Sequence, residues 1–161
     1  MEEEYPLDLS KMITVGYSAG GHLALLAASN PPQGHPPVRA VLAGGAPTDL
    51  TAYPQNDHVS ALMGEGPFSE ENLQEASPVH QVTSTHPPVF LYHGEWDAIV
   101  AIENSTRMRD ALQEAGVPTM LQVRSYLGHI LAYILDGPSI RRGIEFLQDQ
   151  KILPSDQSIK D

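Results

Sequence analysis

The stretch that decides the fold is MITVGYSAGGHLALLAAS, residues 12–29. Its first part, Met12 to Gly16, is an apolar run rich in strand-forming residues, and its last part, Leu23 to Ser29, has the small and apolar residues of a short helix. Between them, Gly16-Tyr17-Ser18-Ala19-Gly20 fits the pattern G-x-S-x-G. A serine held between glycines at a direct strand-to-helix junction predicts a sharp turn that exposes the serine side chain.

This turn is suited to nucleophilic chemistry. Gly16 and Gly20 leave room for the backbone to pass close by, and we expect a larger residue at either position to collide with the neighbouring strand or helix. The helix that follows directs its free N–H groups and positive dipole end toward Ser18, with the N–H of Ala19 as the first donor to a developing oxyanion. We therefore predict a nucleophile at Ser18; the structural alternative is a Gly/Ser turn without chemistry.

The rest of the chain alternates between apolar strand-like runs and helical patterns, which is the signature of a parallel sheet. Two runs, Val38 to Gly44 and Val89 to His93, are almost continuously apolar, as in central strands covered by helices on both faces. The other expected elements are helices over Ile102 to Ala115 and Pro138 to Gln150 and a strand over Met120 to Tyr126. The prediction is an α/β fold with a mostly parallel sheet flanked by helices, in one domain over residues 1–150, followed by a frayed tail over residues 151–161.

A weakly patterned segment interrupts this alternation between Ala46 and Pro88. The pattern is broken at Pro47, Pro54, Pro67 and Pro78, and only short helical pieces such as Glu70 to Ala76 are visible. Long irregular insertions in compact domains usually carry function, commonly as a lid or a pocket wall. We expect the acyl or alcohol side of a substrate to lie there.

A serine nucleophile needs a histidine to accept its proton and a carboxylate to orient that histidine. Asp97 follows the strand that begins at Val89, and His129 follows the strand that begins at Met120. Both therefore lie at carboxyl ends of strands, where sites in α/β sheets gather. Ser18, Asp97 and His129 occur in the order required for such a triad, although Asp97 and His129 taken singly could be ordinary capping residues.

Other residues are candidates for these roles. Asp49 follows the strand that begins at Val38 and is the main competitor for the acid, with Glu95 as a third choice nearer its strand end. The remaining histidines lack the spacing of metal ligands and are expected mostly at the surface or at helix caps; they are His22, His35, His58, His80 and His86. For His22, beside the predicted nucleophile, a packing role is favoured. No metal and no cofactor are predicted.

Composition excludes several classes of function. The formal net charge is -11, from 9 Lys and Arg against 20 Asp and Glu, which disfavours binding to nucleic acid or anionic lipid. There is no cysteine, so disulfides and thiolate metal sites are ruled out. Neither a signal-peptide pattern nor a run of membrane-spanning length occurs, and a cytoplasmic location is expected.

Several motifs together resemble a known family. They are GYSAGGHL from Gly16, GAPTDL from Gly45, ASPV from Ala76, HGEWD from His93, AGVP from Ala115 and the pair Gly128-His129. These look like α/β-hydrolases of the esterase and lipase type, most of all the BD-FAE-like carboxylesterases, which include acetylxylan and feruloyl esterases and lie near the arylformamidases. The resemblance extends from about Leu7 to about Gln150. It implies the α/β-hydrolase fold, hydrolysis of a small-molecule ester, and a triad of Ser18, Asp97 and His129.

The resemblance also implies that this chain carries only the C-terminal portion of that fold. In the family, further strands and an early His-Gly-Gly loop, which gives the second oxyanion donor, precede the serine motif; no His-Gly-Gly occurs here. We therefore expect weak or no activity from the chain alone, and either a homodimer or association with a complementing N-terminal segment. The alternatives to an esterase are a non-catalytic hydrolase module that acts by binding or assembly, and a fragment of a prolyl-oligopeptidase-like peptidase.

Overall fold

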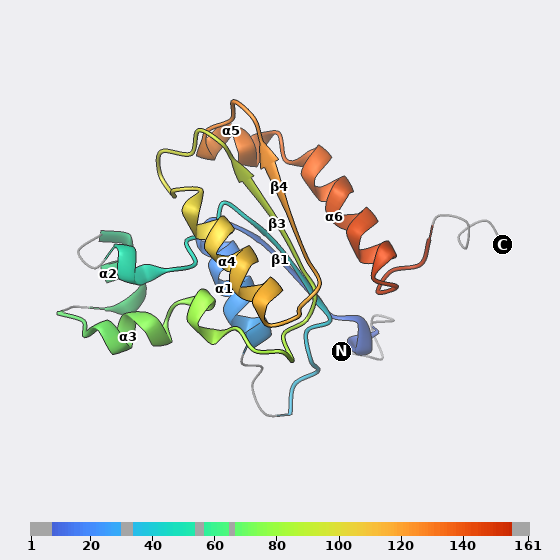
Figure 1. Ribbon diagram of the computed structural model, residues 1–161, viewed down its shortest axis with the longest axis horizontal. Coiled ribbons are helices and arrows are strands. Elements are labelled where there is room, and N and C mark those ends of the chain that lie inside the picture. The colour runs from blue at the N-terminus through green and yellow to red at the C-terminus, as the bar shows by residue number, and fades with distance from the viewer. Residues whose placement is uncertain (1–7, 30–33, 54–56, 65–66, 156–161) are drawn as a thin grey trace, which may run out of the picture.

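A four-stranded parallel sheet forms the centre of the computed structural model, which describes residues 8–29, 34–53, 57–64 and 67–155 (Figure 1). The strands are β1 (Ile13–Tyr17), β2 (Ala40–Gly44), β3 (Val89–Gly94) and β4 (Thr119–Arg124). Their spatial order is the same as their order in the sequence, and every neighbouring pair is parallel. The carboxyl ends of all four strands therefore meet at one edge of the sheet.

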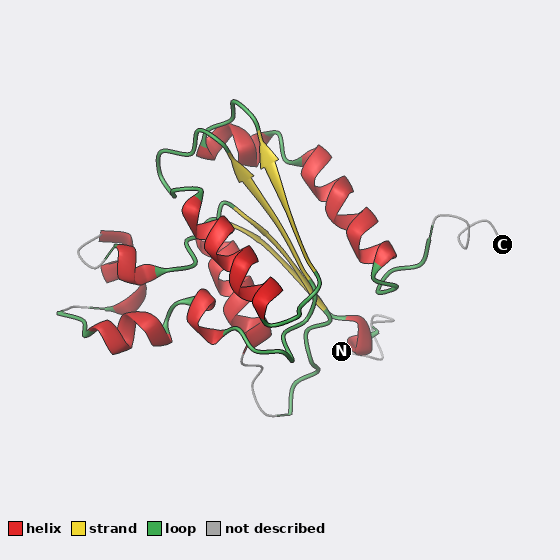
Figure 2. Ribbon diagram, viewed as in Figure 1, coloured by secondary structure: helices red, strands yellow, loops and turns green. Residues whose placement is uncertain are grey.

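Helices cover both faces of this sheet (Figure 2). One face packs against α1 (Ala19–Ser29) and α4 (Glu103–Glu114), whose Leu25, Met108 and Leu112 are fully buried. The other face packs against α6 (Gly137–Asp149) through Phe146 and Leu147, and α5 (His129–Ile134) lies beyond the carboxyl end of β4. This arrangement confirms the predicted α/β class.

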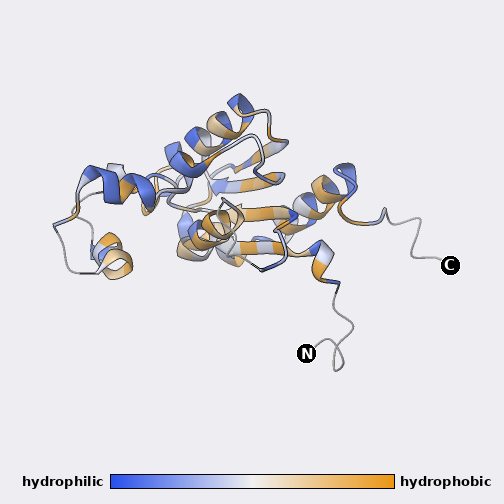
Figure 3. Cartoon of the chain, turned by 90° about the horizontal axis from the view of Figure 1, so that it is seen from below, coloured by the Kyte–Doolittle hydropathy of each residue, from blue (hydrophilic) through white to orange (hydrophobic). Residues whose placement is uncertain are grey.

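The side chains of β2 and β3 alternate between two hydrophobic cores. Leu91 faces the core beneath α1 and α4, whereas its neighbours Phe90 and Tyr92 face the core beneath α6. All residues of these two strands are buried, as expected for strands covered on both faces. Figure 3 shows hydrophobic residues concentrated along the strands.

The segment between Ala46 and Pro88 forms short helices around a small core of its own. The elements are η2 (Leu50–Ala52), α2 (Asp57–Met63), α3 (Glu70–Glu75) and η3 (Pro78–Gln81). They enclose Leu50, Val59 and Leu73. Figure 1 shows α2 and α3 projecting to one side of the sheet.

A short η1 (Leu9–Lys11) precedes β1, and the start of the C-terminal tail differs from the sequence-based expectation. The tail expected to fray from Lys151 onward is instead packed at its start, because Ile152 and Leu153 are partly buried against the core beneath α6 and both donate backbone hydrogen bonds to Leu147. Residues 156–161 lie outside the described residues. No helix in the described ranges is long and apolar enough to cross a bilayer.

Four histidines are buried: His22, His86, His93 and His129. The expectation that His86 lies at the surface was therefore wrong, because His86 is only 6% exposed and its Nε2 contacts the Ser29 hydroxyl at 3.1 Å. Burial lowers the pKa of His22, His86 and His93, since the interior disfavours the charged imidazolium. The folded chain thus holds these histidines neutral at a pH where the unfolded chain protonates them.

We expect the free energy of unfolding to fall as the pH drops below about 6.5, the ordinary pKa of histidine. In that window the unfolded chain binds more protons than the folded chain, so acidification favours unfolding. Urea unfolding at pH 7.5 and pH 5.5 measures the effect, and His86→Gln should reduce the difference between the two midpoints. An equal or higher midpoint at pH 5.5 would contradict this reading of the buried histidines.

Candidate active site

Ser18 lies at the junction of β1 and α1, where its backbone has a φ of 53°. Left-handed backbone at a non-glycine residue costs about 1–3 kcal/mol and persists only where the surroundings hold it. Two hydrogen bonds do so here: the Ser18 N–H donates to the Gly44 carbonyl at 2.8 Å, and the Ser18 carbonyl accepts from the His22 N–H at 3.0 Å. The turn therefore presents the serine side chain at the carboxyl edge of the sheet.

The two glycines of the motif differ in what they contact. A Cβ added at Gly16 would overlap the backbone carbonyl of Gly20, so the expected collision exists there. At Gly20 itself nothing lies within 4 Å of an added Cβ, and the expected collision at that position was wrong. The crowded second glycine is Gly21, where a Cβ would lie 3.0 Å from the Cβ of Ala46.

This difference predicts opposite effects of two matched substitutions. Gly16→Ala should destabilise the fold by about 3 kcal/mol, because the clash is with backbone that cannot move aside. Gly20→Ala should leave stability unchanged or raise it by up to about 1 kcal/mol, since alanine favours the helical conformation. Urea unfolding of both variants tests the pair. Equal losses of stability would show that the packing around the turn at Ser18 is not as described.

Asp97 and His129 form a buried hydrogen-bonded pair. Asp97 Oδ2 lies 2.6 Å from His129 Nδ1, and the Asp97 side chain is fully buried. Its other oxygen, Oδ1, accepts the backbone N–H groups of Ile99 and Val100, each at 2.9 Å. These bonds fix the carboxylate and leave Nε2 of His129 as the ring nitrogen available for proton transfer.

Tyr17 brings His129 close to the serine. The Tyr17 hydroxyl donates to the backbone carbonyl of His129 at 2.7 Å, and the two ring centroids are 5.0 Å apart. Burial and the nearby Asp97 carboxylate raise the pKa of Tyr17, so the phenol keeps its proton and remains a donor. Ser18 and His129 line the same small hollow, together with Tyr17, Ile130 and Tyr133. The only sequence signal for Tyr17 is its place inside the motif G-x-S-x-G, and that signal does not predict the contact with His129.

A second histidine, His93, also contacts Asp97. Its Nε2 lies 3.2 Å from Asp97 Oδ2 and 2.9 Å from the Val100 carbonyl oxygen. Its Nδ1 lies 2.7 Å from the hydroxyl of Ser105 on α4. The sequence predicts His93 only as the end of a strand, and the spacing of four residues between the two ends of HGEWD is the signal for its contact with Asp97.

The competing acids are occupied elsewhere. Asp49 accepts a hydrogen bond from Arg107 at 2.9 Å and another from Thr51. Burial alone would raise the pKa of Asp49, but hydrogen bonds from Thr51 and Arg107 more than offset burial and hold it below the ordinary value. Glu95 accepts from the Tyr126 N–H at 3.2 Å. Of the three candidate acids, the structure brings Asp97 to His129.

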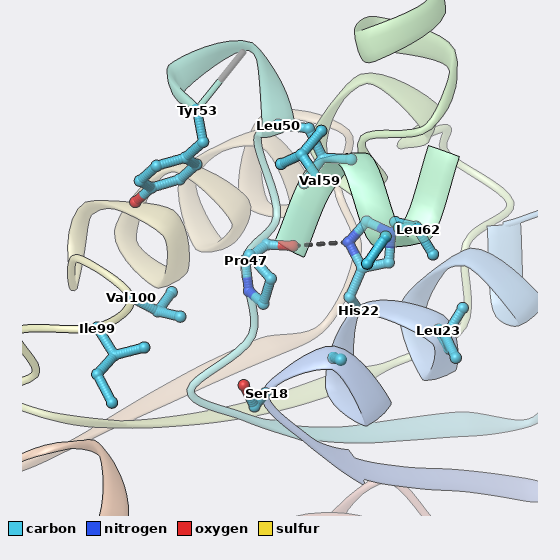
Figure 4. A pocket seen from close by; sticks show the side chains of 12 residues that line it. Ser18, His22, Leu23, Pro47, Leu50, Tyr53, Val59, Leu62, Ile99 and Val100 are labelled. Carbon is cyan, nitrogen blue, oxygen red and sulfur yellow. Dashed lines mark hydrogen bonds between the residues drawn. The ribbon is translucent and has the colours of Figure 1, made fainter. Parts of the chain in front are cut away.

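A pocket of about 510 Å³ opens above Ser18 (Figure 4). Its walls are mainly apolar. They come largely from the segment between Ala46 and Pro88, here called the insertion, and from the loop after β3, through Leu50, Tyr53, Val59, Leu62, Ile99 and Val100. His22 lies against this pocket, and its Nδ1–H donates to the Pro47 carbonyl at 2.7 Å. In the part of the chain that the structure describes, no group of three or more His, Asp or Glu residues is arranged to hold a metal.

Comparison with known sequences places this arrangement in a family. The sequence model of the BD-FAE family matches residues 1–112, more than half of the chain. The chain belongs to the BD-FAE family. The matched region contains Ser18 and Asp97 and ends before His129. A curated relative, endo-1,4-beta-xylanase B of Butyrivibrio fibrisolvens, is 30% identical over 125 residues, which are 71% of this chain and 20% of that protein.

Solved structures show the same fold. An acetyl ester-xyloside bifunctional hydrolase from Caldicellulosiruptor lactoaceticus is similar to this BD-FAE chain with a TM-score of 0.80 and 23% identity, over 94% of this chain and 61% of that one. The carboxylesterase Cest-2923 from Lactobacillus plantarum WCFS1 has a TM-score of 0.78 and 19% identity, over 96% and 64%. This chain therefore has part of an α/β-hydrolase fold and spans less than two thirds of the length of these hydrolases.

Proposed function

We propose that this BD-FAE chain carries the catalytic residues of a serine hydrolase that cleaves carboxylic esters through an acyl-enzyme. The observation that carries the proposal is the buried Asp97–His129 pair, whose imidazole lines the same hollow as Ser18. The two hydrolases with the same fold, an acetyl ester-xyloside bifunctional hydrolase and a carboxylesterase, support this reaction class. No cofactor is part of the proposal.

The proposed reaction has two halves. In the first, Ser18 Oγ attacks the acyl carbon while His129 Nε2 accepts its proton, and His129 then returns that proton to the departing alcohol. In the second, water attacks the acyl-enzyme with the same histidine as base, which releases the acid and restores Ser18. Asp97 stays ionised throughout and stabilises the imidazolium form of His129.

One oxyanion donor belongs to the described chain. Ala19 begins α1, so its N–H is among the first-turn groups that have no acceptor within the helix. We propose that it donates to the oxyanion of the tetrahedral intermediate. The apolar pocket beside it would hold the acyl or alcohol group of a small-molecule ester, through the walls supplied by the insertion.

A fluorophosphonate probe tests the proposal, because it bonds covalently only to a serine activated by a neighbouring base. We expect one probe to add to each chain, together with weak hydrolysis of p-nitrophenyl acetate that the probe blocks. Absence of both from folded protein would contradict the proposed function.

A second role, in assembly, is favoured by the free side of β1. In the described chain β1 pairs with β2 alone, and Val15 at its centre is 58% exposed. An apolar edge strand with unpaired backbone groups is a template for another chain. We propose that isolated chains associate through β1, with a second copy or with a polypeptide that supplies the neighbouring strand.

Light scattering coupled to size-exclusion chromatography should therefore detect species larger than a monomer. Val15→Lys should shift the population toward monomer, because a charge on this strand opposes pairing. Ile144→Lys is the matched control, since Ile144 is also exposed but lies on α6. A monomer at all concentrations, or an equal response of the two variants, would refute association through β1.

A further inference from the structure

The carboxylate of Asp97 is contacted by two histidines through the same oxygen. Oδ2 lies 2.6 Å from His129 Nδ1 and 3.2 Å from His93 Nε2. His129 lines the hollow beside Ser18, whereas the side chain of His93 is fully buried behind Asp97. The two rings therefore have different access to a substrate.

The surroundings of His93 determine where its proton lies. Nε2 faces two acceptors, the Val100 carbonyl and the Asp97 carboxylate, so this nitrogen must carry a proton. Nδ1 faces the Ser105 hydroxyl at 2.7 Å, which can donate to it. Burial lowers the pKa of His93, in keeping with a neutral ring that holds one proton. Every polar atom of the ring thus has a partner.

We propose that His93 is a positioning residue for the reaction, which acts on the base His129 through Asp97; this rests on the proposed ester hydrolysis. The Nε2–H of His93 is shared between Asp97 Oδ2 and the Val100 carbonyl, while the Val100 N–H donates to Asp97 Oδ1. His93 therefore fixes both the plane of the carboxylate and the loop that surrounds it. With that plane fixed, Oδ2 points at His129.

His93 also draws negative charge away from the oxygen that His129 contacts. Without this donor, more charge remains on Asp97 Oδ2, which favours the protonated form of His129. The acid limb of the pH–rate profile should then move to higher pH. Among the described residues, the ionisable groups in contact with the Asp97–His129 pair are His93 and, across the His129 ring, the phenol of Tyr17, which burial keeps protonated.

The test compares two buried histidines. His93→Leu should lower kcat by about tenfold to a hundredfold, the usual cost of losing a group that orients a ligand or base, with KM changed by less than about twofold. His86→Leu is the matched control, because His86 is also buried but is bonded to Ser29 and Pro87 and not to Asp97. It should lower stability without changing kcat.

Conservative variants separate positioning from packing. His93→Gln should recover most of kcat and restore the acid limb, because the glutamine amide can place an N–H where Nε2 lies. If His93→Leu fails to fold, Ser105→Ala gives a milder change: it removes the partner of Nδ1 and should lower kcat by about fivefold. Equal kcat for the wild type, His93→Leu and Ser105→Ala, or no recovery with glutamine, would overturn the proposal.

A spectroscopic readout keeps this inference separate from the proposed function. The proton shared by His129 and Asp97 at 2.6 Å should give a far-downfield proton NMR signal in the resting protein. We expect His93→Leu to shift or broaden that signal and His86→Leu to leave it in place. If the wild type shows no turnover but His93→Leu still changes the signal, the proposed ester hydrolysis is rejected and the positioning role of His93 is kept. A signal that is unchanged in His93→Leu would reject the positioning role of His93.

Discussion

Replacement of Ser18 by alanine is expected to reduce ester hydrolysis to the uncatalysed background and to abolish labelling by a fluorophosphonate. Loss of the serine from a triad of this kind costs about a millionfold in kcat, because no covalent acyl-enzyme can form. The change should leave the fold intact, since the hydrogen bonds that hold the turn come from the backbone of Ser18 and not from its hydroxyl.

The matched control is Ser84→Ala. Ser84 is an exposed serine in a turn, so its loss should change neither turnover nor labelling. Hydrolysis of p-nitrophenyl acetate and probe labelling are measured for both variants beside their urea midpoints. Labelling retained in Ser18→Ala would remove Ser18 from the mechanism.

The second large effect is expected at the acid. Asp97→Asn should lower kcat by about ten-thousandfold, because an amide that donates to His129 Nδ1 selects the wrong tautomer of the imidazole. The change is nearly isosteric, and the oxygen that accepts from Ile99 and Val100 can be kept, so the loss should appear in kcat more than in stability.

Asp49→Asn separates this role from the general effect of losing a buried carboxylate. Asp49 is bonded to Arg107 and Thr51, and its loss should weaken the attachment of the insertion to α4 while leaving kcat within about threefold of the wild type. A larger fall in kcat from Asp49→Asn than from Asp97→Asn would move the acid to Asp49.

Much of the fold could be predicted because local and global signals agree. The apolar runs at Val38 and Val89 are strands buried on both faces, and the tight glycine turn at Ser18 joins a strand directly to a helix. Parallel strands bring their carboxyl ends to one edge, which is why residues as far apart as Asp97 and His129 were expected to meet.

The errors and omissions arise where tertiary packing decides the outcome. Sequence gives no measure of what a side chain would meet, so the open space at Gly20 and the crowding at Gly21 could not be distinguished. Likewise, the partners of His93 lie on a loop and a helix later in the chain. The partial burial of Ile152 depends on contacts with the core beneath α6. No local sequence pattern in the tail predicts those contacts.

Peptide mapping after fluorophosphonate treatment tests the central claim most directly. Trypsin should release residues 12–39 as one peptide that contains two serines, Ser18 and Ser29. Fragment masses then identify the modified residue. In the control, the protein is unfolded in urea before the fluorophosphonate is added, so that no active site is formed. We predict that the adduct is on Ser18, in folded protein only; an adduct on Ser29, or no adduct on folded chain, would contradict the account.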